Sequence, residues 1–327
     1  MEAMTLFRLA LPMIFALASP AVAQEFKLEL PIACDIGKTC WVQQYPDHDP
    51  GPGVADYTCG GQTYDGHDGT DIRVLDTKST ADVVASAPGI VKGLRDGVED
   101  RLARTAADRA AIAKIECGNG VVIAHDGGYE TQYCHMRNGS VAVKKGDAVA
   151  AGQKLGEVGY SGDAAFPHVH LSLRRNGEKL DPFSGAAATA CDAADQSMWS
   201  DSAARKLAYA EGNFLRIGFA PGKIELPALE EGRIANDPPT DDWPAMVVYA
   251  WAINLKKGDT LRIDLTKPDG QTLTNSVTLD RNKAQYLLFT GERRPAAGWR
   301  NGTYRAAIHV ERDGKTIVSR TSEVTIE

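Results

Sequence analysis

After its first 23 residues, the sequence contains no apolar run that approaches the length of a membrane-spanning helix. It also lacks a basic patch and carries a formal net charge of -7, which argues against a nucleic-acid partner because phosphate binding requires clustered lysine and arginine. Its 6 cysteines include no Cys-x-x-Cys pair, so a cysteine zinc site is not expected. The remaining composition is ordinary for globular proteins, with 43% hydrophobic and 24% charged residues, and 327 residues suffice for two modest cores.

The beginning of the chain is typical of a secretory signal peptide. Arg8 precedes the apolar segment 9–17, and Ala21-Val22-Ala23 has the small-x-small pattern of a cleavage site. The alternative is a membrane anchor, but the apolar segment is too short to span the hydrocarbon layer comfortably. We therefore predict a signal peptide over residues 1–23, export across the inner membrane and a periplasmic location.

The even number of cysteines favours disulfides in an oxidising compartment. Cys117 and Cys134 lie on two predicted strands that flank the turn Gly127-Gly128, so we expect them to pair across a hairpin. The other four cysteines allow three connectivities. Of these we favour the pairs Cys40 with Cys59 and Cys34 with Cys191.

The N-terminal half of the mature chain contains two predicted regions. Residues 24–59 are rich in turn formers and are predicted to be a disulfide-pinned lead-in, which we hypothesise lies over the active site and regulates access. Within it, Asp47-His48-Asp49 could bind a metal, but such residues in a proline and glycine loop are more often solvated turn residues. Residues 60–185 alternate short strands with glycine turns and predict a compact antiparallel β-domain, interrupted by a charged helix or excursion over 97–115.

The C-terminal half is predicted to contain a linker and a second β-domain. Residues 186–212 are small and flexible at first and then predict one amphipathic helix over 197–211. Residues 213–327 alternate like strands between turns, which favours an immunoglobulin-like β-sandwich. This sandwich has no evident catalytic cluster, its His309 is expected to be structural, and it could bind a protein partner.

The alternating segment 166–173 predicts a β-strand that carries His168 and His170. Residues two apart on a strand point to the same face, so the two imidazoles are expected to lie side by side. Neighbouring neutral imidazoles suit a metal site or proton transfer. The alternative is that each histidine only satisfies a neighbouring carbonyl group.

Two other segments supply candidate partners for this pair. Gly66 and Gly69 disfavour a helix, so His67 and Asp71 are predicted to lie on a tight loop that enters a strand. Alternatively, Asp71 caps a turn and His67 is a surface histidine. His135 lies on a predicted strand over residues 130–136.

Together these residues could form a hydrolytic zinc site. Catalytic zinc usually has three protein ligands and an open position for water. His67, Asp71 and one of His168 and His170 match that number, which leaves the other histidine and His135 for proton transfer. Zinc lowers the pKa of bound water toward about 7, so an amide carbonyl could be attacked at neutral pH.

These motifs resemble the LytM/lysostaphin-type zinc metallopeptidases, which cut peptide bonds in peptidoglycan. The resemblance covers about residues 60–183 and rests on a His-x-x-x-Asp loop, a histidine after an aromatic residue, and a closing His-x-His. It implies that His67, Asp71 and His170 bind one Zn2+ ion, that His135 and His168 are the unligated catalytic pair, and that His125 is structural.

The expected function is therefore an exported zinc metalloendopeptidase that hydrolyses peptide cross-links of peptidoglycan. One alternative is a non-catalytic member that binds and activates another cell-wall hydrolase, although such members typically lose ligands that this chain retains. Another alternative is a zinc peptidase that acts on proteins. The excursion 97–115 is longer than the resemblance leads us to expect, and we predict that it forms a wall at one end of the substrate groove.

Overall fold

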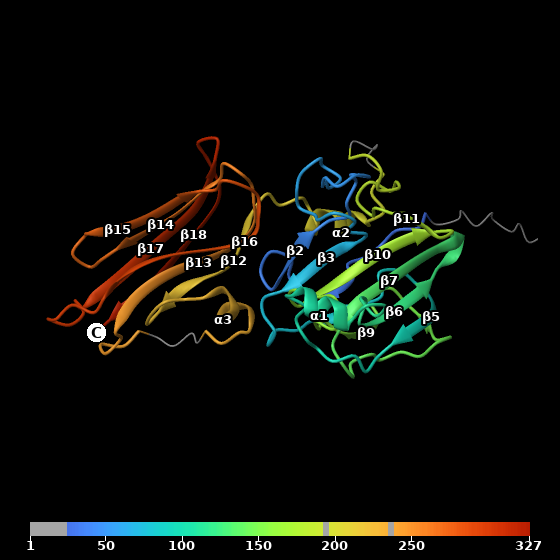
Figure 1. Cartoon of the computed structure of the whole chain (residues 1–327), viewed down its shortest axis with the longest axis horizontal. Coiled ribbons are helices and arrows are strands. Elements are labelled where there is room, and N and C mark those ends of the chain that lie inside the picture. Colours follow the sequence, from blue (N-terminus) through green and yellow to red (C-terminus); the bar gives the residue numbers. More distant parts are fainter. Residues whose placement is uncertain (1–24, 192–195, 235–238) are drawn as a thin grey trace, which may run out of the picture.

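The structure is a computed structural model that describes residues 25–191, 196–234 and 239–327 (Figure 1). The predicted signal peptide lies outside the described residues. The described chain forms antiparallel sheets joined by short helices, which confirms the predicted mainly β fold class. Among the described residues, no helix is long and apolar enough to cross a membrane.

The N-terminal part is built on one large antiparallel sheet. Its strand order is β2-β3-β10-β7-β6-β5-β8, and the short β11 also pairs with β10. A second small sheet has the order β1-β4-β9. The strands of the large sheet are β2 (Cys40–Gln44), β3 (Thr70–Val74), β5 (Gly89–Arg95), β6 (Asn119–Ala124), β7 (Tyr129–Met136), β8 (Ala148–Val149), β10 (His168–Arg175) and β11 (Glu178–Leu180). Those of the small sheet are β1 (Ile32–Ala33), β4 (Asp82–Val84) and β9 (Lys154–Glu157).

The core of this part lies between the two sheets. Ile72 on β3, Ile123 on β6 and Leu171 on β10 are fully buried and belong to one apolar cluster with Val83 and Leu155 of the small sheet. Strand β3 is buried along its whole length because β2 and β10 pair with its two edges. This central position allows β3 to place side chains where solvent is excluded.

The lead-in contributes β2 to the edge of the large sheet, beside β3. Asp47 and His48 are buried rather than solvated. Asp47 accepts hydrogen bonds from the backbone of Asp49, Ala55 and Gly66 at 2.9–3.1 Å. These residues therefore organise the loops that lead to the following segment.

Three disulfides join the described cysteines. The predicted Cys117–Cys134 pair is confirmed, but the other two pairs that we favoured are wrong: Cys34 bonds to Cys40, and Cys59 bonds to Cys191. Gly37 has a positive φ of 84° and turns the backbone so that the Cα atoms of Cys34 and Cys40 lie 6.2 Å apart. This local turn was not visible in the cysteine spacing.

The helices are short. Helix α1 (Ala106–Ala111) lies in the 97–115 excursion and begins with a capping box formed by Thr105 and Asp108. Helix α2 (Asp201–Lys206) is shorter at both ends than the helix predicted over 197–211. It begins only after the cap Ser200, because Trp199 forms a β-bridge with Leu28. The turn between β6 and β7 is a single 3-10 turn, η1 (Asp126–Gly128).

The C-terminal part is a two-sheet β-sandwich. One sheet has the order β12-β13-β16 and the other has the order β15-β14-β17-β18. Tyr304, near the start of β17, donates a hydrogen bond to the carbonyl of Arg300 at 3.2 Å, which is the tyrosine corner of immunoglobulin-like sandwiches. The elements are β12 (Asn213–Ala220), α3 (Leu226–Glu230), β13 (Ala245–Leu255), β14 (Thr260–Thr266), β15 (Thr272–Thr278), β16 (Lys283–Arg293), β17 (Gly302–Arg312) and β18 (Lys315–Ile326).

The sandwich packs directly on the N-terminal part (Figure 1). Trp41 of the lead-in belongs to the same buried apolar cluster as Tyr249 and Trp251 of β13. Gln43 of β2 donates a hydrogen bond to Asn254 at 3.1 Å. The two parts therefore share a desolvated interface that is partly apolar and partly made of side-chain amides.

Candidate metal centre

Three predicted ligands converge between β3 and β10. Asp71 lies on β3 and is opposite His170 of β10 in the register of the two strands, while His67 lies on the loop before β3. His170 Nδ1 is 2.9 Å from Asp71 Oδ1 and 3.2 Å from His67 Nε2. His67 Nε2 is 3.2 Å from Asp71 Oδ1. The three side chains are buried. One ring nitrogen of each histidine and one carboxylate oxygen of Asp71 lie within 4.8 Å of one another.

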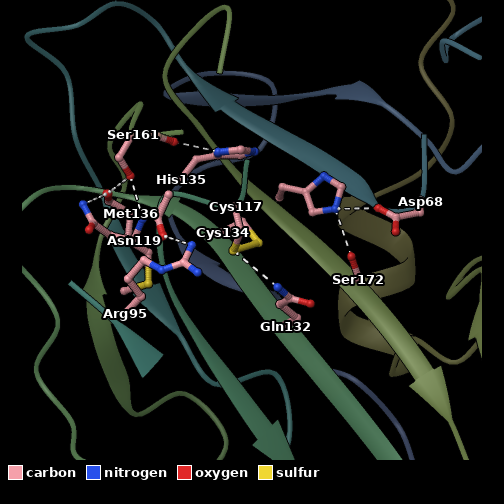
Figure 2. Close-up of a disulfide and its surroundings, with 12 residues drawn as sticks. Asp68, Arg95, Cys117, Asn119, Gln132, Cys134, His135, Met136, Ser161 and Ser172 are labelled. Carbon is pink, nitrogen blue, oxygen red and sulfur yellow. Dashed lines mark hydrogen bonds and ion pairs between the residues drawn. A yellow bond between two sulfur atoms is a disulfide. The ribbon is translucent and has the colours of Figure 1, made fainter. Parts of the chain in front are cut away.

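The second nitrogen of each imidazole in this triad has its own partner. His67 Nδ1 is 2.7 Å from the carbonyl oxygen of Tyr45, which follows β2. His170 Nε2 is 2.9 Å from Ser172 Oγ and 3.3 Å from Asp68 Oδ1 (Figure 2). Such contacts orient the rings, so that His67 Nε2 and His170 Nδ1 would present lone pairs to one ion that displaces the proton beside Asp71.

The electrostatics of the triad are those of an anion surrounded by imidazoles. Although burial opposes its ionisation, the pKa of Asp71 is held well below its usual value by His67, His168 and His170. Although burial opposes its charged form, hydrogen bonds to Asp68 and Asp71 raise the pKa of His170 to about 9. The site therefore favours positive charge next to Asp71.

This donor set fits zinc. Two imidazole nitrogens and one carboxylate oxygen form a common ligand set of catalytic zinc, which keeps a further position for water. Gly69 leaves room for the arrangement, because a Cβ atom at that position would lie 2.5 Å from His170 Nε2. Within the described residues, His67, Asp71 and His170 form the group of side chains that could hold a metal ion.

The other two predicted site histidines lie beside the triad. The ring centroids of His135 and His168 are 4.6 Å apart, and His168 Nε2 is 3.5 Å from Asp71 Oδ1. Nδ1 of each ring meets a backbone carbonyl: Ser161 for His135 at 2.8 Å and Phe166 for His168 at 2.7 Å. Burial lowers the pKa of both rings, so both are neutral near pH 7 and present Nε2 as a proton acceptor.

His135 has an unusual backbone conformation. Its φ is 61°, which lies in a backbone region that residues other than glycine seldom adopt and that recurs at active sites. Its N–H donates to the carbonyl of Cys117 at 2.9 Å, and its carbonyl accepts from Gly159 at 3.0 Å. The disulfide Cys117–Cys134 lies next to His135, as Figure 2 shows.

A cleft of about 250 Å³ opens beside these histidines. Neither the lead-in before residue 60 nor the excursion 97–115 lines it. The excursion instead supports the cleft wall from outside, because Arg109 contacts Asp163 at 3.4 Å. The lining residues are Tyr64, Asp68, Glu116, Cys117, Gln132, Cys134, His135, Asp163, His170, Ser172 and Arg174.

Several residues around the site were missed by the sequence analysis. Tyr64 lies on the cleft, and its ring centroid is 4.4 Å from that of His67. Asp68 and Ser172 orient His170, and the backbone of Tyr45 orients His67. The position of Asp68 beside His67 was a usable signal, whereas the contribution of Tyr45 depends on a carbonyl group that any residue could provide.

The remaining histidines with a predicted role lie elsewhere. His125 contacts the carbonyl of Pro88 and Thr131 Oγ1, each at 2.8 Å. His48 bridges the carbonyl of Ala190 and Asp181 at 2.8 and 2.6 Å. His309 lies on β17 of the sandwich. None of these three contributes to the group of metal-binding side chains found in the described residues.

Comparison with known proteins finds a family model that matches the segment containing this site. Residues 65–182 match the model of Peptidase family M23. DD-carboxypeptidase/endopeptidase Mpg of Neisseria meningitidis serogroup B is 40% identical over 72 residues, which are 22% of this chain and 16% of that protein. Peptidoglycan DD-endopeptidase ShyA of Vibrio cholerae is 39% identical over 64 residues, which are 20% of this chain and 14% of that protein. The matches therefore span only a small part of the curated relatives' length.

Among solved structures, the comparison matches the catalytic domain of the antimicrobial peptidase lysostaphin from Staphylococcus simulans. It is 24% identical, and the alignment covers 42% of this chain and 85% of that chain with a TM-score of 0.27.

Proposed function

We propose that this chain, whose residues 65–182 form a domain of peptidase family M23, is an exported zinc metalloendopeptidase that hydrolyses peptide cross-links of peptidoglycan. The observation that carries the proposal is the convergence of His67, Asp71 and His170 beside two neutral imidazoles, with His170 and His135 lining an open cleft. A purely structural metal site would instead be closed by a fourth protein ligand.

In this proposal the triad holds one zinc ion. Bound zinc supplies a Lewis acid for the scissile carbonyl and lowers the pKa of water. His67 Nε2, His170 Nδ1 and Asp71 Oδ1 are the ligand atoms, and the partners of the other ring nitrogens keep the imidazoles in the required tautomers.

His135 and His168 act on protons. Each ring donates its Nδ1–H to a backbone carbonyl, so Nε2 accepts a proton from the attacking water and returns it to the leaving amine. Once protonated, either imidazole also stabilises the negative charge that develops on the carbonyl oxygen. Burial keeps both rings neutral before this step.

The substrate and the location are proposed from the relatives and the disulfides. Relatives that match part of the chain are named as peptidoglycan DD-endopeptidases. Three disulfides suit an oxidising compartment, and the predicted signal sequence accounts for export to the periplasm. A cleft open to solvent suits a cross-link between two extended strands of a polymer.

The test compares two site variants on purified sacculi. We expect His170→Ala to lose both zinc and peptidoglycan hydrolysis, because it removes a ligand. We expect His168→Ala to retain zinc and lose hydrolysis, because it removes a proton acceptor. Zinc is measured by atomic absorption, and the released muropeptides are identified by mass spectrometry to name the bond that is cut.

His309→Ala is the matched control, since this histidine lies on the sandwich, and it should retain zinc and activity. A wild-type protein that binds zinc but releases no muropeptide contradicts peptidoglycan hydrolysis. Stimulation of a second cell-wall hydrolase would then identify an activator, and cleavage of an unfolded protein such as casein would identify a protein peptidase.

A further inference from the structure

We propose that the C-terminal sandwich positions the peptidase site. Its Trp251 stacks on Arg73, and Arg73 stacks on Phe166. The backbone carbonyl of Phe166 in turn accepts the hydrogen bond from the ring of His168. The kinetic part of this inference rests on the proposed function. Arg73 and Trp251 are positioning residues here, since neither lines the cleft.

Arg73 is the centre of the stack. It lies on β3 two residues after Asp71, is paired in register with His168 of β10, and is fully buried. Its guanidinium carbon lies 4.9 Å from the ring centroid of Phe166 and 5.0 Å from that of Trp251, within the range of cation–π contacts. A planar guanidinium can face aromatic rings in this way, whereas an ammonium group cannot stack.

The hydrogen bonds of Arg73 also cross the interface. Nη1 donates to Gln43 of β2 at 3.1 Å and to Gln285 of β16 at 3.2 Å. Nη2 donates to the carbonyl of Leu75 at 3.1 Å. Within the described residues, no carboxylate comes within ion-pair distance of this guanidinium, and Glu230 and Asp76 favour its charge from farther away. Burial lowers the pKa of Arg73 to about 9, so the group remains charged at neutral pH.

Phe166 connects the stack to the site. Its carbonyl oxygen accepts the hydrogen bond from His168 Nδ1 at 2.7 Å, and its ring centroid lies 4.5 Å from that of His168. The next carbonyl, that of Pro167, accepts a hydrogen bond from the N–H of Val74 at 3.1 Å. A displacement of Phe166 would therefore release the nitrogen that sets the tautomer of His168.

The sandwich fixes the outer side of the stack. Trp251 is fully buried, and its Nε1 donates to Gln285 Oε1 at 3.0 Å. Gln285 in turn donates to Glu230 of α3 at 3.1 Å, and Glu230 accepts from Arg104 of the 97–115 excursion at 2.6 Å. The orientation of Trp251 is thus determined by contacts from both parts of the chain.

A simple docking surface would not require this arrangement. A buried charge that no carboxylate contacts directly has a large desolvation cost, which Glu230 and Asp76 offset only from a distance, and apolar residues would join two β-domains at a lower cost. The charge lies opposite His168 and touches the residue that binds its ring. Its position is explained if the interface also orients the site.

The test uses Trp251→Leu in the full-length, zinc-loaded protein, with Arg73→Lys as a second variant that keeps the charge and loses the stack. A soluble cross-linked muropeptide dimer is the substrate. We expect kcat to fall about tenfold in both variants with little change in KM or bound zinc. Trp251→Phe retains an aromatic face and should restore most of the lost kcat.

Tyr249→Leu is the matched control, because Tyr249 lies on the same strand, belongs to the same buried cluster and, among the described residues, forms no cation–π contact with Arg73. It should weaken the interface while leaving kcat within about twofold. A loss of kcat in Tyr249→Leu equal to that in Trp251→Leu would show a general effect of the interface and overturn the inference.

The tautomer of His168 gives a readout that requires no substrate. Long-range ¹H–¹⁵N spectra of the imidazoles should show the Nδ1–H form in the wild type and a mixture of forms in Trp251→Leu. An unchanged spectrum in a folded Trp251→Leu protein would overturn the inference. If the wild type cleaves no dimer, the proposed function fails, and the spectra still decide whether the sandwich orients His168.

Discussion

Strand β3 carries two buried charges of opposite sign only two residues apart, and their surroundings differ in kind. Asp71 is surrounded by imidazoles, which bind protons and metal ions. Arg73 is surrounded by aromatic rings and side-chain amides, which bind neither. The difference indicates that the surroundings of Asp71 are suited to binding a metal ion and moving protons. The surroundings of Arg73 are suited to holding the side chain in one fixed position.

The two charges also connect different parts of the chain. Asp71 gathers residues of the M23 domain alone, namely His67 and His170. Arg73 gathers the lead-in through Gln43 and the sandwich through Gln285. A substitution at Asp71 should therefore reduce zinc binding more than stability. A substitution at Arg73 should reduce stability more than zinc binding.

The largest effect is expected for Asp71→Asn. The amide has nearly the shape of the carboxylate but no negative charge, so we expect loss of bound zinc and a fall in peptidoglycan hydrolysis of about a thousandfold or more. Bound zinc and muropeptide release are the measurements, and circular dichroism should show an intact fold. A variant that retained zinc and hydrolysis would break the contrast between the two charges.

The complementary prediction is that Arg73→Ala mainly lowers stability. The substitution leaves a cavity between Phe166 and Trp251 and removes the donor to Gln43, so the free energy of unfolding should fall by about 3 kcal/mol. Denaturant unfolding measures the change. The variant should still bind one zinc ion per chain, and a loss of zinc in the folded variant would contradict the proposed division.

Much of the fold could be predicted from local patterns. Alternating residues predicted strands of the sandwich such as β14 and β17, since period-2 burial is a property of each segment by itself. Strand β10 was also predicted, but it is buried on both faces along most of its length. The pairing of Cys34 with Cys40 could not be predicted in this way, because it depends on a turn at Gly37. The start of helix α2 was predicted too early because Trp199 forms a bridge with Leu28, a contact distant in the sequence.

The candidate site shows the same limit. Residue types and spacing predicted His67, Asp71 and one of His168 and His170 as ligands, and the resemblance to LytM/lysostaphin-type peptidases selected His170. The structure brings His67, Asp71 and His170 together. The group that orients His67 is a backbone carbonyl of Tyr45, which has no sequence signature. The role of Arg73 depends on a contact with Trp251, 178 positions away, which only the packing of the sandwich creates.

An intermediate effect is expected for Asp68→Asn, which sharpens the account of the Asp71 surroundings. Asp68 contacts His170 Nε2 at 3.3 Å on the side away from the ligand atom. Removing such a carboxylate from a metal-bound histidine typically lowers metal affinity by about 10- to 100-fold. Competition with a chelator measures the zinc affinity of each variant.

Lys179→Met is the matched control for Asp68→Asn. Lys179 pairs with Asp68 at 2.7 Å but is itself largely exposed, so loss of this pair should change zinc affinity by less than about fivefold. Equal losses in the two variants would mean that general charge near the site, and not the contact with His170, determines zinc affinity.

The smallest effect concerns His125, which tests whether a buried imidazole outside the site affects only folding. Burial lowers its pKa from the ordinary value of 6.5, so the unfolded chain binds more protons than the native chain as the pH falls below that value. The stability contributed by the neutral ring is complete above pH 6.5 and is lost as the pH falls toward the native pKa.

His125→Gln cannot titrate, so denaturant unfolding of the zinc-free proteins should show a weaker loss of stability between about pH 7 and 5 for this variant than for the wild type. Identical slopes would assign the acid sensitivity to other groups, and a loss of zinc in His125→Gln at pH 7 would show that His125 is coupled to the metal centre after all.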